Sequence, residues 1–265
     1  MGAPSPARIS RVLRTALAWA AFGVLCAALG LVVLPLVRRL PRGSAAADLR
    51  AQRALQRAAR LYLGLAAALG VLRLRIDGGE RLRAGGPRLV VANHPTLLDA
   101  VALISLAPQL DCIVNAARVE HPFLSRLAAA AGYIRNDGGP AVVAEATRRL
   151  RAGRSLLVFP EGTRSPRGGL GRFQRGAAHM ALASGYDLLP VVIACDPPTL
   201  AKGERWYEVP GRRFELWLRV GEPLSPRPLL EGGLAPPLAA RRLTAELREV
   251  FAKGLEGSDV PGSRS

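Results

Sequence analysis

The chain of 265 residues is poor in several residue types that mark common protein classes. Only 5% of its residues are aromatic, and it has neither a zinc-finger spacing nor the aromatic-rich pattern of an RNA-binding domain. Its three cysteines, Cys26, Cys112 and Cys195, include no Cys-x-x-Cys pair, which is consistent with a reducing compartment and with packing roles. These scarcities argue against a nucleic-acid partner and against catalytic cysteines.

Three motifs that identify large enzyme classes are also missing. The sequence contains no Gly-x-Ser-x-Gly elbow, no Walker phosphate loop and no Gly-x-Gly-x-x-Gly fingerprint. Their absence weakens the hypotheses of a serine hydrolase, a nucleotide hydrolase and a dinucleotide-dependent enzyme.

Acidic residues are few beside the basic ones. The chain has 20 Asp and Glu against 37 Lys and Arg, a formal net charge of +17, and nearly all the cations are Arg. Guanidinium groups suit phosphates, so this excess favours contact with anionic lipid or with a substrate head group. Charge alone does not choose between these partners.

The first feature that is present is a long apolar run. Residues 15–37 form 23 positions without a charge, about 35 Å as a helix, against a hydrocarbon core of about 30 Å. We expect a transmembrane segment over residues 1–45, with the span near 15–37. A cleaved signal peptide is the alternative, but the run is too long and Arg38, Arg39 and Arg42 follow it. The stronger basic flank after the span predicts a catalytic domain on the cytoplasmic side of the inner membrane.

Residues 46–72 read as an Ala-rich helix with four arginines at spacings of three and four. Arg50, Arg53, Arg57 and Arg60 therefore share one face, which suits anionic membrane lipids. The uncharged run 61–72 is too short to span a bilayer and predicts an interfacial or re-entrant helix. A helix packed in the core of the domain is the alternative.

Beyond Val71, short strand-like runs alternate with helical ones over residues 73–255. We expect helices near 97–106, 122–131, 140–151, 176–184 and 239–255, and a Pro/Gly-rich loop before the last of these. The alternation predicts an α/β domain with a mixed or largely parallel sheet covered by helices, and the tail 256–265 is expected to be disordered. The predicted strands are residues 71–78, 87–93, 111–117, 132–137, 154–160, 187–195 and 213–220.

His94 and Asp99 stand five residues apart in "NHPTLLD", where a predicted strand gives way to a helix. Ligands gather at the carboxyl ends of strands in an open α/β sheet. A histidine held by a carboxylate can take a proton from a hydroxyl while the carboxylate fixes its tautomer. The spacing therefore favours a general base and its partner. A capping histidine and a charge at a helix start remain the alternative.

A second stretch, "FPEGTRS", follows another apolar strand. Glu161 and Arg164, with Gly162 allowing close backbone approach, are suited to a polyol phosphate, because the carboxylate takes a hydroxyl and the guanidinium takes phosphate oxygens. Arg135 in "GYIRND" ends a further predicted strand and is a candidate for the same anion. A surface salt bridge and a solvated loop arginine are the alternatives.

Taken in order, these stretches resemble the glycerolipid acyltransferase family, which includes the lysophosphatidic acid acyltransferases. The family's His-x4-Asp motif is similar to "NHPTLLD", its second block to "GYIR", its third to "FPEGTRS" and its fourth to "LPVVI", and the resemblance covers residues 72–224.

The resemblance implies acyl transfer from a thioester of coenzyme A or acyl carrier protein to a hydroxyl of a lyso-lipid, in phospholipid biosynthesis. It implies that His94 is the general base and Asp99 its partner. By the same resemblance Arg135 and Arg164 are phosphate ligands, and Glu161 binds the acceptor hydroxyl in a loop that includes Gly162 and Thr163. No metal or further cofactor is expected, because a thioester is already activated.

Two departures from the family pattern concern the acceptor. Leu98 stands where relatives often carry an aromatic residue, and Gln174 stands where they commonly carry Lys. The missing cation leaves a different lyso-lipid of a specialised pathway as an alternative acceptor, and a lipid esterase that uses the same histidine as an alternative activity.

Overall fold

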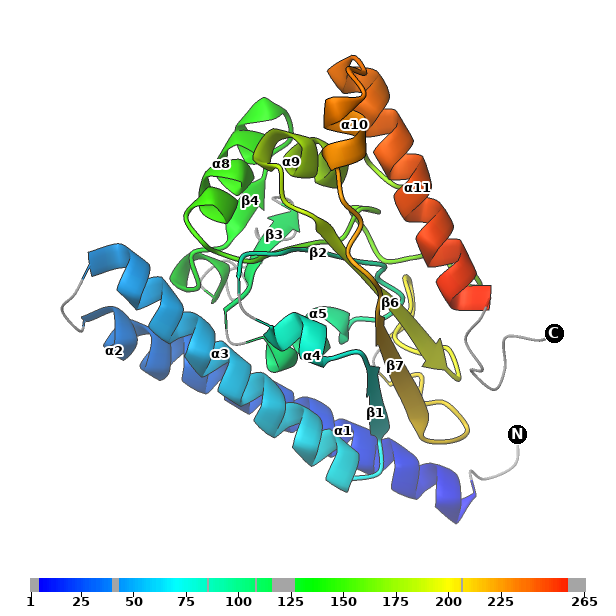
Figure 1. The fold of residues 1–265 in the computed structure, drawn as a ribbon. Helices are drawn as coiled ribbons and strands as arrows, with labels where there is room; N and C mark the ends of the chain where they lie inside the picture. Colours follow the sequence, from blue (N-terminus) through cyan, green and yellow to red (C-terminus); the bar gives the residue numbers. More distant parts are fainter. Residues whose placement is uncertain are drawn as a thin grey trace.

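A mixed sheet lies at the centre of the molecule, between layers of helices (Figure 1). The computed structural model describes residues 5–39, 43–84, 86–107, 109–115, 127–205 and 207–256, and every structural statement below concerns these residues. Within them the strand order is β1-β7-β6-β2-β5-β3-β4; β6 and β7 are antiparallel, and all other neighbours are parallel. The strands are β1 Leu72–Asp77, β2 Leu89–Ala92, β3 Asp111–Asn115, β4 Ile134–Asn136, β5 Leu156–Val158, β6 Leu188–Asp196 and β7 Phe214–Val220.

The predicted fold class is confirmed, and each of the seven predicted strands forms. Strand β2 shows why these apolar runs form strands. Leu89 and Val91 face one apolar cluster while Val90 and Ala92 face the other, and all four are buried. A strand buried on both faces reads as a continuous apolar run, which is typical of a central parallel strand.

Helices cover both faces of the sheet (Figure 1). On one face lie α8 Pro140–Arg151, α9 Gly176–Ser184, α10 Arg227–Glu231 and α11 Pro236–Glu256, and on the other lie α4 Glu80–Arg83, α5 Asp99–Leu106 and the N-terminal helices. Helices α8 and α9 begin and end as predicted. Helix α10 was not predicted, because its region is rich in Pro and Gly; Pro228 occupies its first turn, where proline is tolerated.

One predicted helix, 122–131, is only partly visible. Residues 127–130 are helical, whereas the earlier part, with His121 just before it, lies outside the described residues. The predicted tail lies outside them as well, apart from its first residue, which ends α11.

The N-terminal apolar run is helical from Pro6 to Arg39 and starts nine residues before the predicted span. It comprises α1 Pro6–Ala28, a π-helical turn Leu29–Val33 and α2 Leu34–Arg39. The π turn precedes Pro35, which has no N–H to donate within the helix. This helix is long and apolar enough to cross a membrane, with a mean hydropathy of 2.5 over its most apolar window.

The N-terminal helix is packed against the domain along one stripe only. Trp19, Phe22 and Leu25 face the apolar cluster beneath the sheet, and the opposite stripe leaves large apolar side chains exposed. An exposed apolar stripe of this length is typical of a surface that contacts lipid or another protein. Its members are Ile9, Leu13, Leu17, Val24, Leu31, Val32 and Leu36.

Helix α3 Gly43–Ala68 returns beside α1 and α2 (Figure 1). Its inner face, with Ala51, Tyr62 and Ala66, is buried against the domain, while Arg53 and Arg57 are exposed on its outer face. The inner face of α3 therefore packs in the core of the domain, as in the alternative considered for residues 61–72. Arg60, predicted for the same outer face, instead donates from Nε to the Ser105 carbonyl at 2.8 Å. An interfacial position of α3 stays a prediction.

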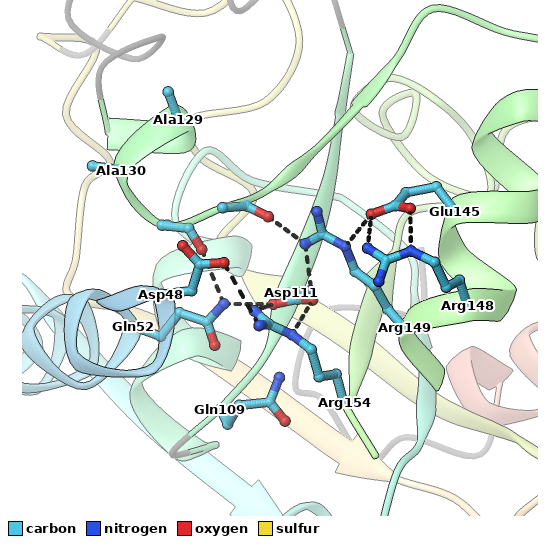
Figure 2. A network of polar contacts seen from close by, with 12 residues as sticks. Asp48, Gln52, Gln109, Asp111, Ala129, Ala130, Glu145, Arg148, Arg149 and Arg154 are labelled. Atoms are coloured by element: carbon cyan, nitrogen blue, oxygen red, sulfur yellow. Dashed lines mark hydrogen bonds and ion pairs between the residues drawn. The ribbon is translucent and has the colours of Figure 1, made fainter. Parts of the chain in front are cut away.

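A buried carboxylate ties α3 to the rest of the domain (Figure 2). Asp111, at the start of β3, is inaccessible to solvent and accepts hydrogen bonds from Arg154 Nε at 2.7 Å, Arg149 Nη1 at 3.0 Å and Gln52 Nε2 at 2.5 Å. Gln52 comes from α3 and Arg149 from α8. A single side chain thus joins the two helical layers through the edge of the sheet.

Arg38 makes a second link at the end of α2. Its Nη2 donates to Asp48 at 3.0 Å and to the carbonyls of Ala129 and Ala130 at 2.8 and 2.9 Å. The end of the N-terminal helix is therefore fixed to α3 and to the segment before β4.

We expect Asp111→Asn to destabilise the protein by about 3 kcal/mol, because it removes the fully buried carboxylate that Arg149 and Arg154 share. Each guanidinium group then keeps one less buried acidic partner, Glu145 for Arg149 and Asp48 for Arg154. Arg148→Gln is the matched control, since the Arg148 pair with Glu145 lies at the surface and such pairs contribute little. Thermal unfolding of both variants in one detergent measures the difference. Equal midpoints for the two variants would contradict the linking role of Asp111.

Candidate active site

The predicted His94 and Asp99 pair forms at the carboxyl end of β2. His94 Nδ1 lies 2.8 Å from Asp99 Oδ2, and Asp99 is the first residue of α5. The carboxylate is inaccessible to solvent, whereas the histidine side chain is 14% exposed. With Nδ1 facing the carboxylate, Nε2 is the ring nitrogen that can exchange a proton with a ligand.

Thr96 completes the arrangement around the carboxylate. Its N–H donates to Asp99 Oδ2 at 2.7 Å, and its hydroxyl donates to Oδ1 at 2.6 Å. Both oxygens of Asp99 are therefore fixed, and the turn between β2 and α5 is held in one shape. The Thr-x-x-Asp spacing carries this signal in the sequence, because a side chain at a helix start commonly bonds a residue three positions away.

Burial raises the pKa of the Asp99 carboxyl above its ordinary value, while hydrogen bonds from His94 and Thr96 act in the opposite direction. The ionised form therefore depends on these donors. When Asp99 is ionised, His94 and Thr96 stabilise its charge in place of water.

A second loop lies against the histidine. Phe159 stacks on the His94 ring with centroids 4.3 Å apart, and Ser165 N–H donates to the His94 carbonyl at 2.7 Å. The Glu161 carboxylate accepts from the Ser165 hydroxyl at 2.6 Å, from Gly171 N–H at 2.6 Å and from His94 N–H at 3.3 Å. In this structure Glu161 joins the two loops, and both of its oxygens are engaged.

Gly171 shows how tightly Glu161 is enclosed. A Cβ at this position would lie 2.6 Å from Glu161 Oε2, closer than real contacts allow. Sequence reasoning did not single out Ser165 or Gly171, because their role depends on a loop that is distant in sequence from His94.

Asn93 fixes the strand that carries the histidine. Its side chain donates to the Ile193 carbonyl and accepts from the Ile193 N–H, both at 2.7 Å. This pair extends the ladder between β2 and β6 by one residue and places His94 directly beyond it. Asn93 also escaped sequence reasoning, because its partner is 100 residues away.

An apolar cavity of about 350 Å³ opens beside His94. His94, Gly162 and Thr163 contribute to its polar part, together with Asn136 at the end of β4. Both N-terminal helices form part of its wall, so the membrane-facing segment also shapes the site. The apolar lining includes Phe22, Leu25, Leu55, Ala59, Tyr62, Val101, Ile104 and Val114.

The two predicted phosphate ligands lie at different places beside this cavity. Arg164 follows two cavity residues, and its Nη1 donates to the carbonyls of Leu200 and Ala201 at 2.9 and 2.8 Å. The Arg135 side chain is 61% exposed and lies 3.5 Å from Asp137. The structure thus brings His94, Asp99, Gly162 and Thr163 together, places Glu161 behind them and leaves Arg135 at the surface.

Cys26 and Cys112 line the cavity, and neither has a disulfide partner. Burial raises the pKa of the Cys112 thiol to about 12, so this group is protonated at neutral pH. His179 lies on α9, which packs on the opposite face of the sheet. These residues are therefore weaker candidates for a reactive group than His94.

Comparison with known proteins agrees with this site. The profile of the acyltransferase family, described as "Acyltransferase", matches residues 73–194. The 1-acyl-sn-glycerol-3-phosphate acyltransferase alpha of Mus musculus is 30% identical over 212 residues, covering 76% of this chain and 72% of the mouse protein. The chain belongs to the glycerolipid acyltransferase family.

Other members of the glycerolipid acyltransferase family match over shorter ranges. The 1-acyl-sn-glycerol-3-phosphate acyltransferase of Limnanthes douglasii is 33% identical over 45% of this chain and 44% of the plant protein. The crystal structure of the 1-acyl-sn-glycerophosphate acyltransferase PlsC from Thermotoga maritima has a TM-score of 0.74 and 22% identity, and covers 96% of this chain and 99% of that one. At this identity the structural match shows a shared fold, which extends to the N-terminal helices.

We expect the wild-type glycerolipid acyltransferase to lose stability relative to Asp99→Asn as the pH rises from acidic to neutral. A pKa that is higher in the folded than in the unfolded protein means that folding favours the protonated carboxyl, and this contribution is lost as the pH rises through the folded pKa. Asparagine does not titrate. The difference in Tm between the two proteins, measured over this range in one detergent, gives the sign. A difference that stays constant or moves in favour of the wild type would contradict the raised pKa.

Proposed function

We propose that this acyltransferase moves a fatty acyl group from a thioester of coenzyme A or acyl carrier protein to the free hydroxyl of lysophosphatidic acid. The single observation that carries the proposal is the His94 and Asp99 pair at the edge of an apolar cavity. The names of the relatives, which are 1-acyl-sn-glycerol-3-phosphate acyltransferases, support the choice of acceptor.

The proposed reaction uses His94 as a proton shuttle. The acceptor oxygen attacks the thioester carbonyl while its proton moves to His94 Nε2, and the buried Asp99 stabilises the resulting imidazolium. The tetrahedral intermediate then expels the thiolate, which takes the proton back from Nε2. The ester and the free thiol are the products, and no covalent enzyme intermediate, metal or prosthetic group enters the scheme.

The apolar cavity is the proposed place of the acyl chain. Its wall joins the reactive histidine to α1 and α3, whose outer faces are apolar or cationic. An acyl chain therefore stays in apolar surroundings between the bilayer and His94, which avoids the cost of exposing it to water.

The positions of the remaining predicted residues in the structure support a role for each. Arg164 and Arg135 are proposed to meet the acceptor phosphate, since their neighbours Thr163 and Asn136 line the cavity beside His94. Glu161 is proposed as a positioning residue, because both of its oxygens hold loop donors.

The setting of the reaction is also a proposal. The apolar face of α1 supports attachment to a membrane. The basic flank in the sequence is the argument for the cytoplasmic side, whereas in the structure both ends of the helix lie against the same domain. The exposed Arg53 and Arg57 on α3 are suited to anionic lipids.

One observation supports a second candidate acceptor. Gln174, whose N–H donates to the Pro160 carbonyl at 2.7 Å, lies next to the Glu161 loop without the cation that relatives commonly carry there. A lyso-lipid that lacks a phosphate monoester is the alternative acceptor.

A panel of acceptors tests the proposed function. We expect purified protein with a radiolabelled acyl thioester to acylate lysophosphatidic acid faster than a monoacylglycerol with the same chain, and His94→Ala to lower the rate by roughly 100-fold or more while remaining folded. His179→Ala is the matched control and should keep the wild-type rate. Hydrolysis without transfer would support the esterase instead, a preference for the monoacylglycerol would support the second acceptor, and wild-type turnover in His94→Ala would contradict the mechanism.

A further inference from the structure

A second, smaller hollow of about 40 Å³ lies at the other end of the N-terminal helix. Its lining includes the beginning of α1 and residues 199–200, 208–210 and 212–213 of the segment 197–213 that connects β6 to β7. Trp19, Tyr62 and Phe214 are the aromatic residues of its lining. Four guanidinium groups surround it, from Arg11, Arg14, Arg212 and Arg213.

Two of these arginines are held by protein groups. Arg212 pairs with Asp196 at 2.7 Å, and Arg213 Nε donates to the Leu72 carbonyl at 2.8 Å. Arg11 and Arg14 form no ion pair with any residue of the described ranges. Glu208 is the carboxylate among the lining residues, so positive charge remains in excess around the hollow.

The opposite end of the same apolar helix is arranged differently. There Arg38 is neutralised by Asp48 and satisfied by two backbone carbonyls. Arg11 and Arg14 instead line a hollow in which four arginines stand beside one acidic residue, Glu208. The two basic ends of the helix are therefore unlike, and the first borders a hollow that can take an external anion.

The segment 197–213, which lies opposite α1, contains a residue with an unusual backbone conformation. Leu200 has φ of +56°, a left-handed conformation that is unusual for a bulky residue, and its side chain lines the hollow. Its carbonyl accepts from Arg164. A strained conformation of this kind persists where the surroundings enforce it, and it is often found at ligand sites.

We propose that Arg11, Arg14, Arg212 and Arg213 form a binding site for the phosphate group of an anionic membrane lipid. Guanidinium groups bind phosphate oxygens through paired, charge-assisted hydrogen bonds. Leu13 and Leu17, which are exposed on the same helix, place lipid next to Arg14 and favour a phospholipid over a soluble ligand. The occupant is a structural lipid that bridges α1 and the segment 197–213, and it is not the acyl acceptor.

The site borders the reactive loop without containing it. Leu98, which also lines the hollow, directly precedes Asp99. A bound head group therefore fixes α1 beside the turn that carries the catalytic pair. The proposal does not depend on acyl transfer, because none of the four arginines contacts His94 or Asp99 in the described structure.

The test uses the full chain in a non-ionic detergent, titrated with a short-chain phosphatidylglycerol and with the diacylglycerol of the same chains. We expect tighter binding of the phosphatidylglycerol, and a Kd raised by roughly ten-fold or more in the double variant Arg11→Gln/Arg14→Gln. The matched control is Arg241→Gln/Arg248→Gln, which removes the same charge from the exposed side of α11, on the other face of the sheet. His94→Ala should bind as the wild type does, which separates this site from the reaction.

Three results would overturn the proposal. If the two double variants lose phosphatidylglycerol affinity equally, the lipid is attracted to positive charge in general and not to this site. Wild-type affinity in Arg11→Gln/Arg14→Gln would mean that the site does not exist. Displacement of the lipid by coenzyme A or inorganic phosphate at comparable concentration would assign the arginines to a soluble phosphate in place of a lipid. We expect neither competitor to displace it.

Discussion

The hydrogen bond between His94 and the buried Asp99 is the interaction on which the site depends. A carboxylate without access to water stays ionised only if the protein supplies its hydrogen bonds, and here the donors are His94 and Thr96. The surrounding structure holds these donors in place. Asn93 fixes the end of β2, and the Glu161 loop fixes the backbone of His94 from the other side.

The N-terminal helices serve two purposes in one structure. The outer stripe of α1 is apolar and exposed, whereas its inner stripe packs on the domain and lines the cavity beside His94. Asp111 anchors α3 to the start of β3 through buried polar contacts, and Arg38 joins α2 to α3 and to the segment before β4. The helix pair is therefore part of the catalytic domain's wall and not only a tether to the membrane.

Local patterns in the sequence were sufficient for the strands, for helices α8 and α9 and for the His94 pair. The reason is that burial on two faces, first-turn prolines and a His-x4-Asp spacing are all visible within short windows. The linking role of Glu161, the bonds of Asn93 and the anchor at Asp111 were not visible, because each needs a partner far away in sequence. The inner face of α3 shows the same limit, since its Ala-rich pattern suits a lipid surface and a protein core equally well.

The role of Thr96 tests the account most directly, because this buried side chain touches no substrate and acts through Asp99. The measurement is kcat and acceptor KM for Thr96→Val and Thr96→Ser beside the wild type. If the hydroxyl keeps Asp99 ionised and aligned, valine lowers kcat by roughly ten-fold or more with little change in KM, and serine restores it. Wild-type kcat in Thr96→Val, or equal losses in a folded Thr96→Ser, would contradict the account.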